Sequence, residues 1–195
     1  LEFGAGTGIF TEKLIEMPFL EITALDKDLM CCKMLEKYLR GKGNCRGVQG
    51  DASTWGDTEP FDIIVSTFAH DHIHYDQGAA LARNIYKNLA PGGHYFMGGE
   101  ILPFYSTEEE RKEALNTYHG FIVSKSLREG NYRLAQIEIN ALESGIGMIG
   151  DFKRHEELFE KEMAAGDLKL ESKAKMGPSH LDDVGGVYVY GYTRP

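Results

Sequence analysis

Three glycines at alternate positions, Gly4, Gly6 and Gly8, lie near the start of the chain, directly after the pair Glu2-Phe3. Glycine tolerates positive φ and lets a ligand approach the backbone, because it has no Cβ atom. The next residues, Ile9–Ile15, predict a helix, and the free backbone N–H groups at a helix start can hold a polar ligand. The sequence therefore begins with a strand, a tight glycine turn and a helix start, which together favour a ligand site.

A carboxylate ends the second predicted strand. The segment Phe19–Leu25 is apolar and partly β-branched, which predicts a buried strand that ends at Asp26. A carboxylate in this position, about 20 residues after a glycine turn, is where a ribose diol is held. Its two oxygens can accept hydrogen bonds from both hydroxyls. Asp28 is predicted to cap the following helix, Leu29–Leu39.

A second carboxylate follows the third predicted strand. That strand is Cys45–Gln49, and Gly50-Asp51-Ala52 comes directly after it. Taken alone, a Gly-Asp pair is best explained as a turn. Its place in the order, after the glycine turn and Asp26, favours a ligand contact by Asp51 at the same edge of the sheet.

The clearest strand of the sequence, Phe61–Phe68, leads into its densest group of chemically active side chains. A parallel α/β sheet places its ligands at the carboxyl ends of the strands, so the residues after Phe68 are expected to face the reaction. These residues are His70, Asp71, His72, His74 and Asp76.

Three explanations of this cluster stay open. A histidine with a near-neutral pKa can act as a general base, for which His70, Asp71 and His72 are the candidates. His70, His72 and His74 alternate along the chain, so they can converge on a metal ion if the segment is extended. The cluster can also be a polar loop of solvated or capping side chains. Because the sequence shows no convergence, we assign no metal ligands.

A pair of helices is predicted after the fifth strand. Ser106-Thr107 precedes three glutamates, which is typical of a helix start. The first helix is predicted to run to about Glu129, and the second from Tyr132 to Leu142 or Glu143. These helices form an insertion of some forty residues.

The remaining residues predict a hinge, a helix and two closing strands. The glycine-rich stretch Gly145–Gly150 is expected to be flexible and to act as a lid hinge. Asp151 is predicted to cap a helix that ends near Gly166. Leu168–Ala174 alternates as a half-exposed strand does, and Gly186–Tyr192 is the last predicted strand.

The order and spacing of these features resemble those of the class I S-adenosylmethionine-dependent methyltransferases. The turn Gly4–Gly8 with the acidic Glu2 is similar to their first motif, and its spacing is not the G-x-G-x-x-G of dinucleotide-binding folds. Further likenesses are Asp26, Asp51, the strand Phe61–Phe68, the turn Pro91-Gly92-Gly93 and the final strand pair. The resemblance covers essentially the whole chain. It implies a doubly wound α/β fold with a seven-stranded, mostly parallel sheet, an antiparallel last strand and a helical insertion between strands five and six.

The same resemblance implies a cofactor, S-adenosylmethionine, and the residues that hold it. The glycine turn would carry the methionine part and Asp26 the ribose, with Lys27 and the Asp51-Ala52 pair beside the adenine. The predicted cofactor site consists of Glu2, Gly4, Gly6, Gly8, Asp26, Lys27, Asp51, Ala52 and Ser66. The predicted catalytic residues are His70, Asp71 and His72.

Composition and charge limit the classes of molecule that are expected to accept the methyl group. The formal net charge of −9 disfavours nucleic acid, whose phosphates require clustered Lys and Arg. No apolar run approaches the ~20 residues of a membrane span. With the insertion at 104–150 as an expected substrate lid, a small-molecule acceptor is favoured, and oxygen is the first expectation for the accepting atom. Ser66–Ala69 stands where nucleobase N-methylating enzymes carry Asn-Pro-Pro-Tyr, which argues against that substrate.

Two other functions are considered. An NAD-dependent oxidoreductase is disfavoured by the G-x-G-x-G spacing and by the closing strand pair. A non-catalytic module that keeps the cofactor pocket for a regulatory or partner-binding role is compatible with the same residues. The sequence leaves the oligomeric state open.

The start of the chain and its three cysteines lead to two further expectations. Leu1 falls inside the expected first strand and no methionine precedes it, so we expect the chain to be part of a longer protein, with residues 1–195 forming one domain. Cys31, Cys32 and Cys45 form no disulfide framework or metal motif and are expected to be reduced thiols of a cytoplasmic protein.

Overall fold

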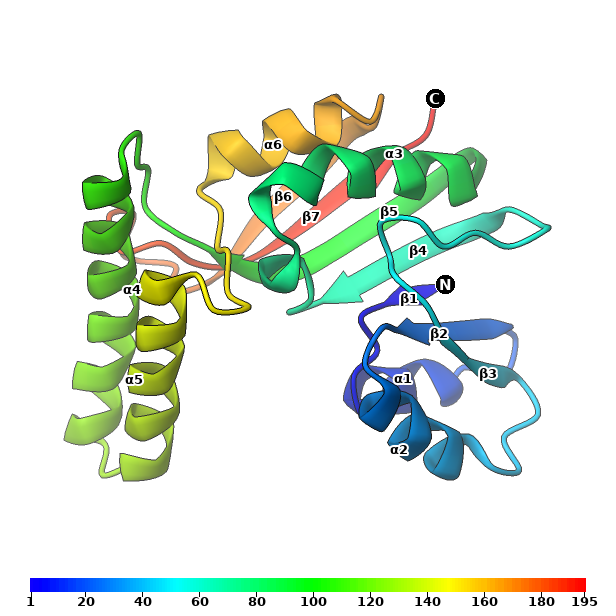
Figure 1. Ribbon diagram of the computed structural model, residues 1–195, viewed down its shortest axis with the longest axis horizontal. Helices are drawn as coiled ribbons and strands as arrows, with labels where there is room; N and C mark the ends of the chain where they lie inside the picture. The colour runs from blue at the N-terminus through cyan, green and yellow to red at the C-terminus, as the bar shows by residue number, and fades with distance from the viewer.

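The computed structural model describes all residues, 1–195, and is built on one sheet of seven strands (Figure 1). The strands are β1 (Glu2–Phe3), β2 (Ile22–Asp26), β3 (Cys45–Gln49), β4 (Phe61–Thr67), β5 (Leu89–Ile101), β6 (Lys169–Gly177) and β7 (Gly186–Thr193). The helices are α1 (Ile9–Ile15), α2 (Leu29–Leu39), α3 (Gly78–Asn88), α4 (Glu108–Arg128), α5 (Tyr132–Gly147) and α6 (Glu156–Ala164). Two short 3₁₀ helices, η1 (His70–His72) and η2 (Tyr75–Gln77), precede α3.

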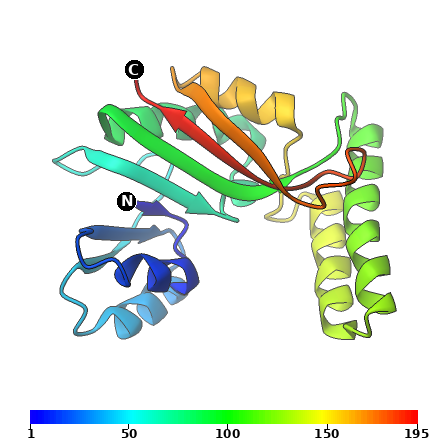
Figure 2. The same ribbon diagram turned by 180° about the vertical axis from the view of Figure 1, so that it is seen from behind.

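The strand order, β3-β2-β1-β4-β5-β7-β6, confirms the predicted fold class. Strands β1 to β5 pair in parallel, β7 is antiparallel to β5, and β6 is antiparallel to β7 (Figure 2). The order reverses between β1 and β4, where the chain crosses from one half of the sheet to the other. In an open α/β sheet such a switch point leaves a crevice at the carboxyl ends of the strands.

The main core lies between the sheet and the helices α3 and α6, which cover the face opposite α1 and α2 (Figure 1). Leu81 and Ile85 of α3 and Phe159 and Met163 of α6 are buried there against strand side chains such as Tyr95. Each fully buried side chain of this size contributes about 1.5–3 kcal/mol. This packing fixes α6 on the sheet and, with it, the polar side chains that α6 carries.

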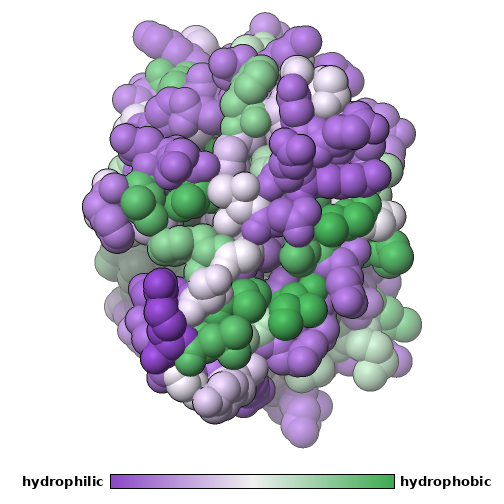
Figure 3. Space-filling model, turned by 90° about the vertical axis from the view of Figure 1, so that its left-hand side faces the viewer, coloured by the Kyte–Doolittle hydropathy of each residue, from purple (hydrophilic) through white to green (hydrophobic).

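The helices α4 and α5 form a hairpin that projects beyond the end of β5 (Figures 1 and 2). Thr107 and Glu110 form a capping box at the start of α4, as expected from the sequence, and Asn131 caps α5. Figure 3 views the molecule from the hairpin side and shows hydrophobic side chains gathered in patches between hydrophilic ones. None of the helices combines the length and the apolar character that crossing a bilayer demands.

The predicted hinge after α5 is shorter than expected, because the helix continues to Gly147. The buried Arg111 donates to the backbone carbonyls of Gly145 at 2.8 Å and Ile146 at 3.3 Å. Gly145 packs against Leu115 so closely that a Cβ atom would lie 2.9 Å from it. Contacts from α4 therefore hold the end of α5 in helical form.

Two predicted element boundaries are wrong for physical reasons. The second strand begins at Ile22, because Phe19 lies in a turn in which the Leu20 N–H donates to the Met17 carbonyl, and Phe19 is 80% exposed. The residue that precedes α6 is His155, so Asp151 does not cap this helix. The segment 151–154 is buried, and its Arg154 carbonyl accepts a hydrogen bond of 2.9 Å from the Leu102 N–H, directly after β5.

Candidate functional site

A cavity of about 370 Å³ lies at the carboxyl ends of β1, β2, β3 and β4. Nine of the residues predicted for the site line it: Gly4, Gly6, Asp26, Lys27, Asp51, Ala52, Ser66, His70 and His72. Glu2, Gly8 and Asp71 lie outside its lining. The fold thus brings together residues spread over seventy positions of the sequence, at the switch point of the sheet.

The three glycines of the turn serve different purposes. All three have positive φ, at +69° for Gly4, +54° for Gly6 and +94° for Gly8. A Cβ atom on Gly4 would lie 2.3 Å from the Cβ of Ala69, and one on Gly8 would lie 2.9 Å from Leu35. No atom lies within 4 Å of the corresponding position on Gly6. Gly4 and Gly8 therefore permit close packing, whereas Gly6 leaves open space at the cavity wall.

Glu2 supports the glycine turn from outside the cavity. Its side chain is 1% exposed and accepts a hydrogen bond of 2.6 Å from the Thr11 hydroxyl. Burial raises the pKa of Glu2, and the hydrogen bond from Thr11 opposes that change. Glu2 thus ties β1 to α1 and supports the glycine turn without bordering the cavity.

Asp26 joins the end of β2 to the glycine turn. One carboxylate oxygen accepts from the Gly6 N–H at 2.7 Å, and the other from the Asp28 N–H at 2.8 Å. Each carboxylate oxygen has a further lone pair, so Asp26 can still accept from a diol in the cavity. Asp28 itself caps α2 by accepting from the Cys31 N–H at 2.8 Å, as the sequence predicted.

Asp51 is a turn residue that also borders the cavity. Its carboxylate accepts from the Ser53 N–H at 2.7 Å, which is the contact of a turn residue. The side chain is exposed and borders the cavity together with Ala52. Across the cavity, the buried Ser66 hydroxyl is hydrogen-bonded to the Tyr95 hydroxyl at 2.8 Å. Tyr95, which also lines the cavity, was not found from the sequence.

His70 borders the cavity but is 4% exposed. Its Nε2 lies 3.1 Å from the Glu162 carboxylate, and its Nδ1 is buried without a hydrogen-bond partner. Its ring packs edge-on against Phe159, with 4.7 Å between the ring centroids. Burial lowers the pKa of His70, and the hydrogen bond to Glu162 opposes this. His70 is therefore held as a neutral imidazole.

Asp71 points away from the cavity into a buried group of charges. Burial raises its pKa to about 7, although Lys153 nearby lowers it. Lys153 lies 2.5 Å from Asp151 and 3.1 Å from Glu100, so three carboxylates surround one ammonium group. This placement gives Asp71 no contact with the cavity.

His72 is the exposed histidine of the cavity rim. Its Nδ1 lies 2.6 Å from the carbonyl oxygen of Gly150. A carbonyl only accepts, so Nδ1 carries the proton and donates. In the neutral ring the other nitrogen, Nε2, then has a free lone pair. His72 thus has the tautomer that a general base requires.

The histidines of the cluster do not converge on a common point. His74 pairs with Asp76 at 2.6 Å, His70 with Glu162, and His72 with Gly150. No group of three or more His, Cys, Asp and Glu side chains in residues 1–195 is arranged to hold a metal ion. The metal interpretation of the cluster therefore has no geometric support, and the three cysteines form no disulfide.

Two buried residues of the site, Arg154 and Glu162, were not found from the sequence. Arg154 is 1% exposed, and its Nε lies 3.1 Å from the Glu162 carboxylate that also binds His70. No local pattern singles out either residue, because His70, which contacts both, lies 84 residues before Arg154 and 92 residues before Glu162.

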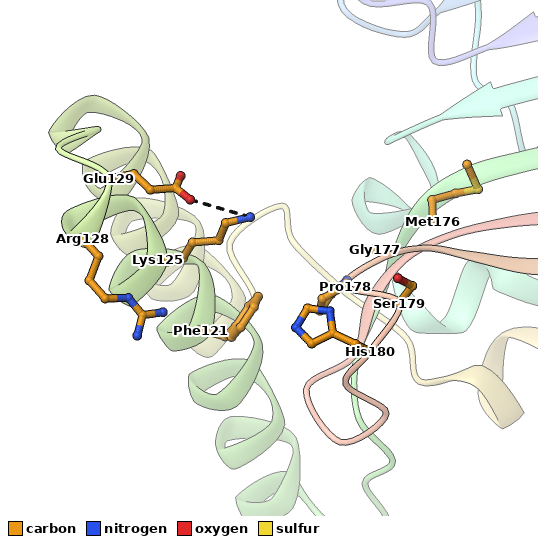
Figure 4. Close-up of a pocket in the computed structure, with 9 residues that line it drawn as sticks. All are labelled: Phe121, Lys125, Arg128, Glu129, Met176, Gly177, Pro178, Ser179 and His180. Atoms are coloured by element: carbon orange, nitrogen blue, oxygen red, sulfur yellow. Dashed lines mark ion pairs between the residues drawn. The ribbon is translucent and has the colours of Figure 1, made fainter.

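A second cavity, of about 460 Å³, lies between α4 and the loop that joins β6 to β7 (Figure 4). Phe121 and His180 face each other across it, and Lys125 turns towards Glu129, 4.0 Å away. None of the residues predicted for the site lines this cavity. Phe121 of α4 borders this cavity. Its neighbours Tyr118 and His119 do not, because their side chains are buried in the hairpin.

Comparison with known proteins bears directly on the first cavity. Residues 1–93, which include all of its predicted residues, match the family model of methyltransferase domains. Among curated protein sequences, none matches the chain.

Solved structures share the fold over almost the whole chain. An S-adenosylmethionine-dependent methyltransferase from Clostridium acetobutylicum aligns with a TM-score of 0.68 and 13% identity, over 98% of this chain and 82% of that chain. The N-methyltransferase NodS from Bradyrhizobium japonicum, in complex with S-adenosyl-L-homocysteine, gives 0.61 and 18%, over 100% and 76%. The mitomycin 7-O-methyltransferase MmcR gives 0.68 and 16%, over 100% and 48%. Residues 1–93 thus match the methyltransferase domain family, and the whole chain shares the class I methyltransferase fold of these solved structures.

Proposed function

We propose that this protein transfers a methyl group from S-adenosylmethionine to a small-molecule acceptor, with oxygen as the accepting atom. The observation that carries the proposal is the cavity at the switch point, which Gly6, Asp26 and His72 line together. Its volume, about 370 Å³, lies in the range of small-molecule and cofactor sites.

The residues of the cavity fit the chemical groups of the cofactor. Gly6 leaves room for the methionine part to approach the backbone, and the Asp26 carboxylate has lone pairs for the ribose hydroxyls. Lys27, Asp51 and Ala52 border the end of the cavity assigned to the adenine. Ser66, held by Tyr95, supplies a polar floor. The same set of contacts would not serve the pyrophosphate of NAD, for which the turn lacks the G-x-G-x-x-G spacing.

The cofactor supplies a methyl group activated by a positively charged sulfur. The chain then has to orient the acceptor in line with it, which can contribute about 7–11 kcal/mol to lowering a barrier. A hydroxyl acceptor must also lose its proton. His72 Nε2 is the exposed base of the cavity rim and receives that proton, an effect worth about 10²–10⁴-fold in rate.

A small molecule suits the surroundings of the cavity. NodS is named as an N-methyltransferase and MmcR as an O-methyltransferase, so the fold supports both accepting atoms. The net charge of −9 disfavours a nucleic acid acceptor. The hairpin at 104–150 leads directly to Gly150, which contacts His72, and on this proposal the hairpin closes the acceptor side of the site.

The test has two steps. Calorimetric titration with S-adenosylhomocysteine measures cofactor binding without any acceptor. A screen with methyl-labelled S-adenosylmethionine over a panel of phenols, alcohols, amines and thiols then identifies the accepting atom. Label transferred to a hydroxyl supports the proposal, and label transferred only to nitrogen or sulfur rejects the assignment of oxygen. Cofactor binding with no transfer to any acceptor supports the non-catalytic alternative.

A further inference from the structure

We infer that Arg154 and Glu162 are positioning residues that hold the segment His70–His74 in its active geometry. The inference rests on the proposed function, because that segment carries His72, the proposed base. The segment follows β4 and lies outside the sheet, so strand pairing does not fix it. Its geometry must come from other contacts.

Arg154 supplies most of these contacts. The guanidinium is planar and presents five N–H donors in a fixed fork, which a lysine cannot reproduce. It also lies over the Tyr75 ring, 4.9 Å from its centroid. The guanidinium NH groups donate to four backbone carbonyls: Ile73 at 2.5 Å, Phe152 at 2.7 Å, His70 at 3.3 Å and His74 at 3.3 Å. One buried side chain thus fixes three carbonyls of the segment and one of the neighbouring segment.

Glu162 completes the arrangement from α6. Its oxygens lie 3.2 and 3.1 Å from Arg154 Nε, so the two buried charges neutralise each other. The oxygen at 3.1 Å from Arg154 also accepts from His70 Nε2 at 3.1 Å. His70 Nδ1 is then the unprotonated nitrogen of a cavity-lining ring, and it has no partner in the protein. Glu162 therefore sets the tautomer of His70.

Gly78 has no side chain, and the Glu162 carboxylate occupies the space that a side chain there would fill. A Cβ atom on Gly78, in the first turn of α3, would lie 2.1 Å from the carboxyl carbon of Glu162. An alanine there would displace the Glu162 carboxylate without removing any charge. Gly78 thus offers a way to disturb the pair from outside it.

The geometry of His72 depends on the same network. Phe152, whose carbonyl Arg154 binds, donates its own N–H to the Asp71 carbonyl at 2.7 Å. Two residues earlier, Gly150 accepts from His72 Nδ1. Arg154 therefore holds together the two segments that the His72–Gly150 hydrogen bond joins. Without the Arg154 guanidinium, this hydrogen bond would no longer keep the proton of His72 on Nδ1.

The test compares Arg154→Lys with a matched control, Arg194→Lys. Arg194, which is half-buried, also lies over a tyrosine: it donates to the carbonyls of Tyr86 and Leu89 and lies 4.4 Å from the Tyr86 ring centroid. Its contacts do not involve the segment His70–His74. Each variant loses the planar guanidinium of one arginine, so Arg194→Lys controls for a general loss of stability.

The readout is nitrogen NMR of the histidine rings, which reports the tautomer and the pKa of each imidazole without any acceptor substrate. In Arg154→Lys we expect His72 to change from the single Nδ1-protonated tautomer to a mixture of both, while Arg194→Lys keeps the wild-type signals. In Glu162→Gln we expect the pKa of His70 to change, while the ring-nitrogen signals of His94, on β5, stay the same. Unchanged His70 and His72 signals in folded variants would overturn the inference.

The variant Gly78→Ala provides an alternative test if Arg154→Lys does not fold. A folded Gly78→Ala protein is expected to show altered His70 signals, and wild-type signals would again overturn the inference. S-adenosylhomocysteine is titrated into each protein as a separate probe. If wild-type protein does not bind it, the proposed function fails, whereas the NMR comparison still decides whether Arg154 and Glu162 set the two histidine tautomers.

Discussion

The Nδ1 atom of His72 lies 2.6 Å from the carbonyl oxygen of Gly150, which follows it by 78 residues in the chain. This contact joins the segment after β4 to the residue that ends the helical hairpin region. It also fixes which ring nitrogen carries the proton and leaves Nε2 free on the cavity rim.

Replacing His72 by Ala is expected to lower the turnover number by about 10²–10⁴-fold, because the acceptor loses its base. The affinity for S-adenosylhomocysteine is expected to stay close to that of the wild type. His94→Ala is the control, since His94 of β5 lies outside the cavity lining and contacts Glu171 of β6 at 3.3 Å. Steady-state assays with the acceptor from the screen provide the measurement, and wild-type turnover in His72→Ala would remove His72 from the chemistry.

Replacing Asp26 by Ala is expected to weaken S-adenosylhomocysteine binding by about 10–100-fold, the equivalent of about 1.5–3 kcal/mol for hydrogen bonds to a charged group. Asp62→Ala is the control, because Asp62 is exposed near the opposite end of β4. Calorimetry on both folded proteins gives the comparison. Equal affinities in the two variants would reject Asp26 as a cofactor ligand.

Gly6→Ala and Gly130→Ala separate ligand contact from backbone strain. Both glycines have positive φ, +54° and +73°, and neither would bring a Cβ atom within 4 Å of another residue. Each variant is expected to lose about 1–2 kcal/mol of unfolding free energy. Only Gly6→Ala is expected to lose cofactor affinity, since Gly130 lies in the turn between α4 and α5. Urea denaturation and calorimetry measure the two quantities, and equal affinities would argue against a ligand at Gly6.

The pH dependence of stability tests the environment of Asp71. Burial raises its pKa to about 7, against the opposing charge of Lys153 and Arg154 and with the support of Glu100 and Asp151. Between about pH 4 and pH 7 the folded protein therefore keeps a proton that the unfolded chain releases, and stability falls as the pH rises.

An Asp71→Asn variant keeps a neutral side chain at every pH. Its unfolding free energy relative to the wild type is expected to rise from about pH 4 to about pH 7, by on the order of 1–3 kcal/mol, and then to level off. The lowered pKa of His70 acts in the opposite direction in both proteins and is removed by the subtraction. Urea denaturation over this range measures the difference, and a flat difference would show that Asp71 is ionised throughout.

The sequence predicted best the elements that local chemistry determines. Helix α2 was predicted with its observed bounds, because Asp28 is a strong cap and apolar residues follow it at helical spacing. The strand β4 was evident from the aromatic Phe61 and the β-branched residues Ile63, Ile64 and Val65. The glycine turn and the carboxylates Asp26 and Asp51 follow from the strand ends, which a parallel sheet brings to one edge.

Contacts between distant segments decided what the sequence could not predict. Helix α5 continues past its predicted end because Arg111 of the other helix binds its last carbonyls. His70 and Asp71 appeared equivalent to His72 as bases, yet Glu162 and burial hold them in structural contacts. Arg154 gave no signal at all, because its four carbonyl partners leave no trace in local sequence patterns.

Calorimetric titration of the protein with S-adenosylmethionine, S-adenosylhomocysteine and NAD tests the proposed cofactor directly. We expect micromolar binding of the first two ligands and no binding of NAD, because the cavity joins an open glycine turn to the Asp26 carboxylate without a dinucleotide fingerprint. Binding of NAD, or no binding of any of the three, would contradict this expectation.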